Sequence, residues 1–388
     1  MKKRRIGVIG FVIAFFLFAG FASPESPPER IKTFLQRGVE KGLRLDEKAA
    51  IAEFRKAIDL DRENPLGYAC LAMAHLFSYE TAFEEKEKKE KEAFFLRAVE
   101  DALVRAEKKI EREPRNGEAF FAAAIAKMAR NRYEIILKNY FRAFRHAQNV
   151  WDYLEKVQEI DPENYDVYYP MGIFHYYLSQ LSGMTRWITS LFITPGDREK
   201  GLKELEWAAA KGLLLKDLAQ SNLVSAYSGY EKKPARALPF ARRLREKYPE
   251  NYNFSFGLAN ILSDLGQPEE ALSIARGIAD GIKSGIPPYR PELWPRHSLL
   301  LGKIALDQGE YDRAAEHFNQ ALKDKAPYNA RIRAYALLRL GMIQDGRKEH
   351  KAAEEYYRKV LDLEGAEGTA QQLAREYLDT PYMPPRRR

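Results

Sequence analysis

The sequence predicts an all-α fold, a right-handed superhelical solenoid of stacked helix pairs that is closed by a helix at its C-terminal end. The first observation is an internal repeat, because six residues between 301 and 321 recur with similar side chains, in the same order and spacing, between 340 and 360. The second is that no stretch longer than a few residues alternates between apolar and polar with period two, the pattern of half-buried strands. The third is that Gly and Pro fall between helical segments rather than in hairpin signals.

The repeat places small and bulky residues at fixed positions. Its first copy contains Leu301, Gly302, Ala305, Ala314, Phe318 and Ala321, and its second contains Leu340, Gly341, Gln344, Ala353, Tyr357 and Val360. Small residues let two antiparallel helices approach closely, and bulky residues fill the spaces between them. This pattern resembles the tetratricopeptide repeat, a helix pair of about 34 residues, and in particular its exported, periplasmic bacterial members. The resemblance implies a scaffold that binds partners on its concave face.

The same register extends over residues 31–363 as about eight units. They start at 31, 65, 117, 165, 217, 252, 295 and 334. Three of the first four intervals exceed the usual length of the repeat, so we expect long helical extensions within 65–216. Residues 364–381 are predicted to form a capping helix, which covers the apolar face of the last unit. Residues 382–388 are predicted to be a basic tail.

The start of the chain, residues 1–22, reads as a targeting segment. Residues 2–5 are basic, residues 6–21 carry no charge, and Gly20 and Ala22 suit signal-peptide cleavage. This apolar run falls just short of the roughly 17–25 residues that span a bilayer, so an uncleaved anchor in the inner membrane is the alternative. Both interpretations predict export of the remaining chain, through a Pro-rich linker at 23–30, to the periplasm.

The net charge of +8 lies mainly at the chain ends. Residues 1–22 contribute four positive charges and residues 386–388 three, so the rest of the chain carries +1. A nearly neutral body argues against a broad nucleic-acid-binding surface. Cys70 is the single cysteine, so no intramolecular disulfide can form, and its apolar neighbours predict a buried side chain.

The search for catalytic residues gives no candidate. The six His form no HExxH motif or His-x-x-x-His pair, and the sequence contains no GxSxG, Walker-type or GxGxxG motif. His75 and His175 fall on a packing position of the repeat. We therefore expect a protein that is not an enzyme and that holds no cofactor and no metal.

Residues 180–196 form an apolar segment with a single charge, Arg186. It is predicted either to be an extra helix buried in the solenoid or to contact a membrane or ligand. Together with the following Gly-Asp-Arg and Gly-Leu residues, it is also similar to a eukaryotic tetratricopeptide family over this short stretch. The local pattern predicts a helix start, with Asp197 as its N-cap.

The resemblance places the binding groove on the first helix of each unit. The side chains that it assigns to the concave face are Phe121, Ile125, Asp166, Tyr169, Ile173, Tyr176, Tyr177, Phe256, Asn260, Arg296, Leu299 and Lys303. Six aromatic residues within 165–177 favour a peptide or an amphiphile as ligand. The alternative is that several of these rings only fill gaps beneath residues 180–196. The carboxylate clamp of some family members is missing, because Phe256 stands where that clamp has Lys or Arg.

Two functions follow from these observations. The first is an exported scaffold that holds a protein or peptide in its groove. The second is a periplasmic carrier of a small molecule or lipid, associated with a transporter or envelope pathway, in which the aromatic centre closes a pocket. Neither involves nucleic acid.

Overall fold

The computed structural model describes residues 26–82, 85–181, 194–366 and 368–383. These residues form seventeen α-helices and no strand, which confirms the predicted all-α solenoid. The predicted signal segment, residues 182–193 of the apolar segment and residues 384–388 of the tail lie outside the described residues. Within the described ranges, no helix combines the length and the apolar character that crossing a bilayer requires.

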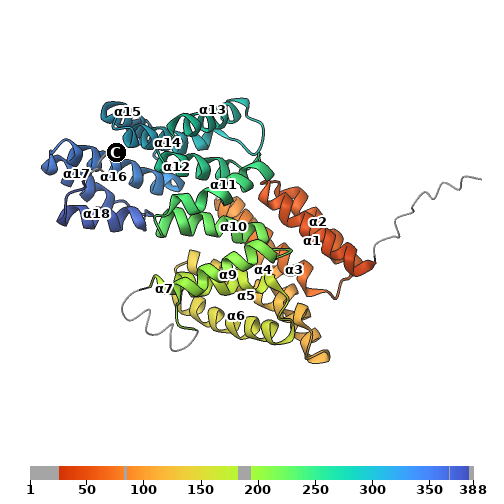
Figure 1. Ribbon diagram of the computed structural model, residues 1–388. Helices are drawn as coiled ribbons and strands as arrows, with labels where there is room; N and C mark the ends of the chain where they lie inside the picture. The colour runs from red at the N-terminus through yellow and green to blue at the C-terminus, as the bar shows by residue number, and fades with distance from the viewer. Residues whose placement is uncertain (1–25, 83–84, 182–193, 367, 384–388) are drawn as a thin grey trace, which may run out of the picture.

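The helices stack as successive antiparallel pairs (Figure 1). The first four pairs are α1 (Pro27–Leu43) with α2 (Glu47–Leu60), α3 (Pro65–Thr81) with α4 (Glu85–Arg112), α5 (Gly117–Ile136) with α6 (Tyr140–Ile160), and α7 (Tyr168–Ser179) with α9 (Arg198–Lys211). The long helices α4, α5 and α6 lie in the part of the chain where the repeat interval is longest. Pro27 and Pro28 begin α1, where a missing N–H does no harm, so helix replaces the end of the predicted linker.

The last four pairs are shorter and more regular. They are α10 (Lys216–Ser225) with α11 (Pro234–Lys247), α12 (Tyr252–Asp264) with α13 (Pro268–Ser284), α14 (Trp294–Asp307) with α15 (Tyr311–Ala321), and α16 (Ala330–Gly346) with α17 (His350–Leu361). A π-helical turn, η2 (Ala226–Tyr230), extends α10, and 3₁₀ turns η1 (Tyr165–Val167), η3 (Pro291–Leu293) and η4 (Pro327–Asn329) precede α7, α14 and α16. The last helix, α18 (Thr369–Asp379), packs on α16 and α17.

Asparagine caps begin several first helices. Asn64, Asn116 and Asn251 each accept a backbone N–H from the first turn of α3, α5 and α12. Each cap satisfies a donor that the helix itself cannot pair. Asp197 caps α9 in the same way, as its sequence predicts.

The repeat pattern appears in the structure as a glycine facing a ring. A Cβ on Gly302 would stand 2.6 Å from Cδ1 of Phe318, and one on Gly341 would stand 2.8 Å from Cδ1 of Tyr357. Gly38 and Phe54 meet in the same way in the first pair. With the ring in this position only a glycine fits, so the contact lets the two helices of a pair approach closely.

The first helix pair returns to contact the middle of the chain. Nδ2 of Asn251 donates to the carbonyl oxygen of Leu43 at 2.7 Å, and the guanidinium of Arg44 pairs with Glu250 at 2.9 Å. Figure 1 shows α1 and α2 beside α10 and α11. One continuous apolar core therefore runs from Ile31 to Ile304.

The C-terminal end is fastened by Asp345. Its carboxylate accepts hydrogen bonds from the hydroxyl of Tyr357 at 2.6 Å and from the backbone N–H of Tyr382 at 2.9 Å. Tyr382 also lies against the ring of Tyr377. The first residue of the predicted tail is therefore docked on the last units.

Candidate functional site

The predicted groove residues divide into buried and half-buried side chains. The buried ones are Phe121, Ile125, Asp166, Tyr169, Tyr176, Phe256 and Lys303, and the half-buried ones are Ile173, Tyr177, Asn260, Arg296 and Leu299. Most of the large rings therefore contribute to packing between first helices. Their role in binding stays a prediction.

Asp166 illustrates a different use of a residue at a concave position. Its carboxylate accepts the backbone N–H groups of Leu213, Leu214 and Leu215 at 2.8–3.1 Å. These donors lie between two helices, where no helical carbonyl is in place to accept them, so Asp166 fixes the connection between α9 and α10. The carboxylate is occupied within the fold.

A polar network closes the centre of the solenoid. The hydroxyl of Tyr176 donates to Glu231 Oε1 at 3.0 Å, and Nε of Arg198 donates to the same oxygen at 2.6 Å. The hydrogen bond from Arg198 lowers the pKa of Glu231 below its usual range, against the opposing effect of burial. This network joins α7, α9 and the end of η2, three elements that no sequence pattern connects.

Tyrosines from α7 and η2 form the half-exposed rim beside this network. The rings of Tyr177 and Tyr230 lie 5.7 Å apart, edge to face, and burial raises the pKa of Tyr177 to about 12. Nδ2 of Asn222 on α10 donates to the hydroxyl of Tyr169 at 3.2 Å. The rim itself thus offers the phenol groups of Tyr177 and Tyr230, above the buried Tyr169.

The C-terminal first helices present cations. Nη1 of Arg296 on α14 donates to Oδ1 of Asn253 on α12 at 2.6 Å, and its guanidinium lies 4.2 Å from the centre of the Phe256 ring. Burial lowers the pKa of Arg296 to about 10. Within the described part of the chain, no carboxylate lies within ion-pair distance of this guanidinium. Because a guanidinium carries five N–H donors in a planar fork, Arg296 can also donate to a ligand.

The cations near Arg296 differ in how they are neutralised. Nζ of Lys303 lies 2.6 Å from Asp264 and 2.6 Å from Asp307, so its charge is balanced within the fold. Arg339 on α16 lies over the rings of Phe318 and Tyr335, and burial lowers its pKa. Like Arg296, it has no ion-pair partner among the described residues. The half-buried face of α12, α14 and α16 thus carries two guanidinium groups that form no ion pair among the described residues, although Asp264 and Asp307 also act on the charge of Arg339.

His175 is the histidine closest to catalytic geometry, and it is enclosed. Its Nδ1 lies 2.6 Å from Glu204 Oε2, and both side chains are buried. The edge of Trp151 packs against the imidazole. A substrate could not reach this pair, so it serves packing. The described residues also contain no group of three or more His, Cys, Asp or Glu that could hold a metal ion.

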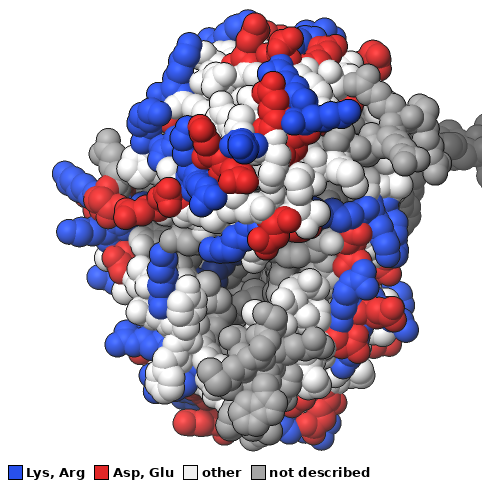
Figure 2. Space-filling model, turned by 90° about the vertical axis from the view of Figure 1, so that its left-hand side faces the viewer, with Lys and Arg blue, Asp and Glu red and all other residues white. Residues whose placement is uncertain are grey.

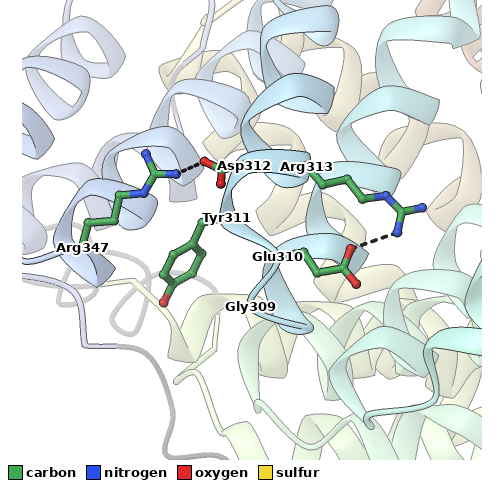
Figure 3. A pocket seen from close by; sticks show the side chains of 6 residues that line it. All are labelled: Gly309, Glu310, Tyr311, Asp312, Arg313 and Arg347. Carbon is green, nitrogen blue, oxygen red and sulfur yellow. Dashed lines mark hydrogen bonds and ion pairs between the residues drawn. The ribbon is translucent and has the colours of Figure 1, made fainter.

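Two surface cavities have charged linings. One, of about 490 Å³, lies between the α14–α15 and α16–α17 turns, where Arg313 pairs with Glu310 at 2.9 Å and Arg347 pairs with Asp312 (Figure 3). The other, of about 330 Å³, lies where α1 meets α10 and α11, and its Lys247 contacts both Glu40 and Asp217. Their charges neutralise one another, and neither cavity suits an apolar ligand.

The surface charges are mixed as well. Figure 2 shows Lys and Arg interspersed with Asp and Glu over the face in view, with no continuous basic area among its described residues. This agrees with the nearly neutral composition of the body.

Two protein-family models match parts of the chain. Residues 230–285 and 299–368 match the tetratricopeptide repeat model, over the units in which Gly302 and Gly341 face their rings. These parts of the chain are tetratricopeptide repeats. Such proteins use extended concave surfaces to bind partners and are generally scaffolds. Residues 39–208, less than half of the chain, match a second family, regulator of microtubule dynamics protein 1-3.

Several solved structures are similar to the chain at low identity. Yeast Tom70 is 13% identical, with 91% of this chain and 82% of that chain covered and a TM-score of 0.41. The human IFIT1 dimer with PPP-AAAA is 14% identical, with 91% and 84% covered and a TM-score of 0.43. A tetratricopeptide repeat protein from Parabacteroides merdae is 14% identical, with 80% and 99% covered and a TM-score of 0.32. No curated protein matches the sequence.

The sequence did not predict two of the charged residues described above, Arg339 on the C-terminal face and Glu231 in the central network. Arg339 lies outside the positions that the repeat assigns to the groove, and Glu231 lies on a different helix pair from Arg198, its partner. For Arg339 a signal existed. Arginine with apolar neighbours on a first helix is unusual, because its charge must be desolvated.

Proposed function

We propose that this protein is a non-enzymatic scaffold that binds an extended, acidic peptide segment of a partner protein along α12, α14 and α16. The observation that carries the proposal is Arg296, a half-buried guanidinium held by Asn253 and Phe256 without a carboxylate partner in the described chain. A charged group in a partly desolvated position binds an opposite charge more strongly than one in open water.

The neighbouring residues suit a peptide backbone. Asn260 lies on α12, one turn from Phe256. Arg339 lies on α16, the first helix of the unit that follows Arg296. Guanidinium groups on successive first helices can contact acidic side chains at separate points of one extended chain. The buried Phe256 ring underlies Arg296 and supports its guanidinium at the surface. Phe256, a predicted groove residue, thus contributes by supporting a cation and not by reaching a ligand itself.

The carrier of a small molecule or lipid is the weaker candidate. The aromatic residues of α7 pack against their neighbours, and the two cavities described above have charged linings. We therefore favour a binding site on the open C-terminal face, where Lys303 is already neutralised and Arg296 is not.

The scaffold is proposed to act after export, in the periplasm. The basic start and apolar stretch of residues 1–22 support this location, either as a cleaved signal or as an inner-membrane anchor. The intact mass of the mature protein distinguishes the two, since loss of residues 1–22 indicates cleavage and retention of Met1 indicates an anchor.

A selection from a random peptide library tests the proposed function. The wild-type chain is expected to enrich peptides with Asp or Glu, and Arg296→Gln is expected to lose that enrichment. Arg276→Gln, an exposed arginine on α13, is the matched control and should select the same peptides as the wild type. Native mass spectrometry provides the opposing outcome, because a co-purifying lipid with no selected acidic peptide would favour the carrier.

A further inference from the structure

The connection between α5 and α6 presents a group of large apolar side chains to solvent. We name Ile135, Ile136, Leu137, Tyr140 and Phe141 the α5–α6 tip; all five are exposed, Tyr140 to 66% and Phe141 to 74%. Single exposed apolar residues are ordinary, but five within seven positions form a contiguous patch. Figure 1 places α5 and α6 at the lower edge of the molecule.

The tip has a defined conformation because a buried carboxylate holds it. Glu134 lies at the end of α5, where Oε1 accepts from Arg130 at 3.0 Å and Oε2 accepts from Nδ2 of Asn139 at 3.0 Å. The backbone N–H of Asn139 also donates to the carbonyl oxygen of Glu134 at 2.8 Å. Lys138, with φ of +59°, turns the chain in between. These bonds fix the apolar side chains outward at the turn.

From the tip into α6, the sequence carries charges of one sign only. Lys138, Arg142 and Arg145 are exposed, and no Asp or Glu occurs from residue 135 to residue 151. The guanidinium of Arg145 lies 5.3 Å from the centre of the Phe141 ring, so cation and ring occupy the same surface. In a chain whose body is nearly neutral, this local excess of positive charge requires an explanation.

We propose that the α5–α6 tip docks on an anionic lipid surface. Tyr and Phe prefer the boundary between headgroups and acyl chains, and Lys and Arg beside them attract anionic headgroups. A surface turn that exposes both kinds of side chain and buries its one carboxylate, Glu134, has the chemistry of a peripheral membrane contact. Ile135, Ile136 and Leu137 would enter the apolar layer, while Arg142 and Arg145 would meet phosphate groups.

A fluorophore at the tip tests this docking directly. Burial raises the pKa of the Cys70 thiol to about 12, so Phe141→Cys can be labelled selectively in the full chain with the polarity-sensitive dye NBD. Phosphatidylcholine vesicles that contain phosphatidylglycerol should brighten the dye and shift its emission to the blue, whereas phosphatidylcholine alone should do so much less. Ile286→Cys, exposed to 67% between α13 and η3, is the matched control and should show no shift.

A second variant measures how much the tip contributes. Tyr140→Ser combined with Phe141→Ser should lower the fraction of protein bound to anionic vesicles about tenfold or more. The reason is that the variant loses two rings that would be buried in the membrane. The circular dichroism spectrum should stay unchanged. Ile286→Ser should bind as the wild type does.

Three results would overturn the proposal. The first is vesicle binding without a blue shift at position 141, which would indicate attachment through residues 6–21 alone. The second is a blue shift that depends on protein concentration without lipid, which would indicate that a second copy covers the tip. The third is equal binding by the wild type and the double Ser variant.

Discussion

The central and C-terminal units hold their helix pairs together in different ways. In the C-terminal units, Gly302 and Gly341 each face a ring of their own unit. In the central unit, Gly172 and Gly201 bring two backbones together, because a Cβ on Gly201 would stand 2.5 Å from the backbone nitrogen of Tyr176 and 2.8 Å from the carbonyl oxygen of Gly172. A side chain can move to accept a new neighbour, whereas a helix backbone cannot.

The two regions also differ in how far their contacts reach along the sequence. Gly302 and Phe318 belong to one helix pair, but the ties that close the central region, Arg44 to Glu250 and Leu43 to Asn251, join the first pair to the middle of the chain. The difference shows that one fold family can build regular units from local contacts and a closed centre from distant ones.

The largest effect is expected for the backbone contact in the centre. Gly201→Ala should lower the free energy of unfolding by about 3 kcal/mol, since α9 and α7 must separate to admit the methyl group. Urea denaturation followed by circular dichroism measures it. Gly277→Ala on α13 is the control, because a Cβ there meets nothing within 4 Å, and it should raise stability by about 0.5–1 kcal/mol. A neutral Gly201→Ala would show that the backbones are not in contact.

A smaller loss is expected for the matching glycine in the C-terminal units. Gly302→Ala should cost about 1–2 kcal/mol, because the Phe318 ring can shift to accept the methyl group. The same denaturation experiment compares it with Gly201→Ala. Equal losses for the two variants would contradict the distinction between a ring contact and a backbone contact.

These two glycines show what sequence could and could not predict. The Gly302 contact was predictable, because its partner lies in the same repeat unit and the register fixes their spacing. The neighbours of Gly201 were not, since the interval around it is much longer than the repeat and shifts the register. Asp166 fell on a groove position by register, yet its carboxylate binds the backbone after α9.

The exposed tip was missed for a related reason. A helical reading of residues 135–141 assigns their apolar side chains to the core, and only the position of the turn at Lys138 exposes them. The sequence did contain a signal for a turn. The polar pair Lys138-Asn139 stands between three apolar residues and two aromatic ones. Side chains at a helix end lose the neighbours that a continuing helix would supply.

A pH-dependent contribution is expected from the central network. The pKa of Glu231 is lower in the folded state than the unfolded value of about 4.3, so its contribution is present above that value and lost as the pH falls through the folded pKa. Glu231→Gln should cost about 1 kcal/mol at pH 7 and less in acid. Urea midpoints at several pH values measure this. Glu246→Gln on α11 is the exposed control, and a loss that does not change with pH would contradict the assignment.

The proposed function depends on Arg296 contacting a carboxylate, and a double-mutant cycle measures that contact directly. A selected acidic peptide and its Glu→Gln or Asp→Asn variants are titrated by calorimetry into the wild type and Arg296→Gln. We expect one peptide position to couple to Arg296 by about 1–2 kcal/mol, because removing either charge leaves the other without its partner. Additive effects at every acidic position would contradict binding on this face.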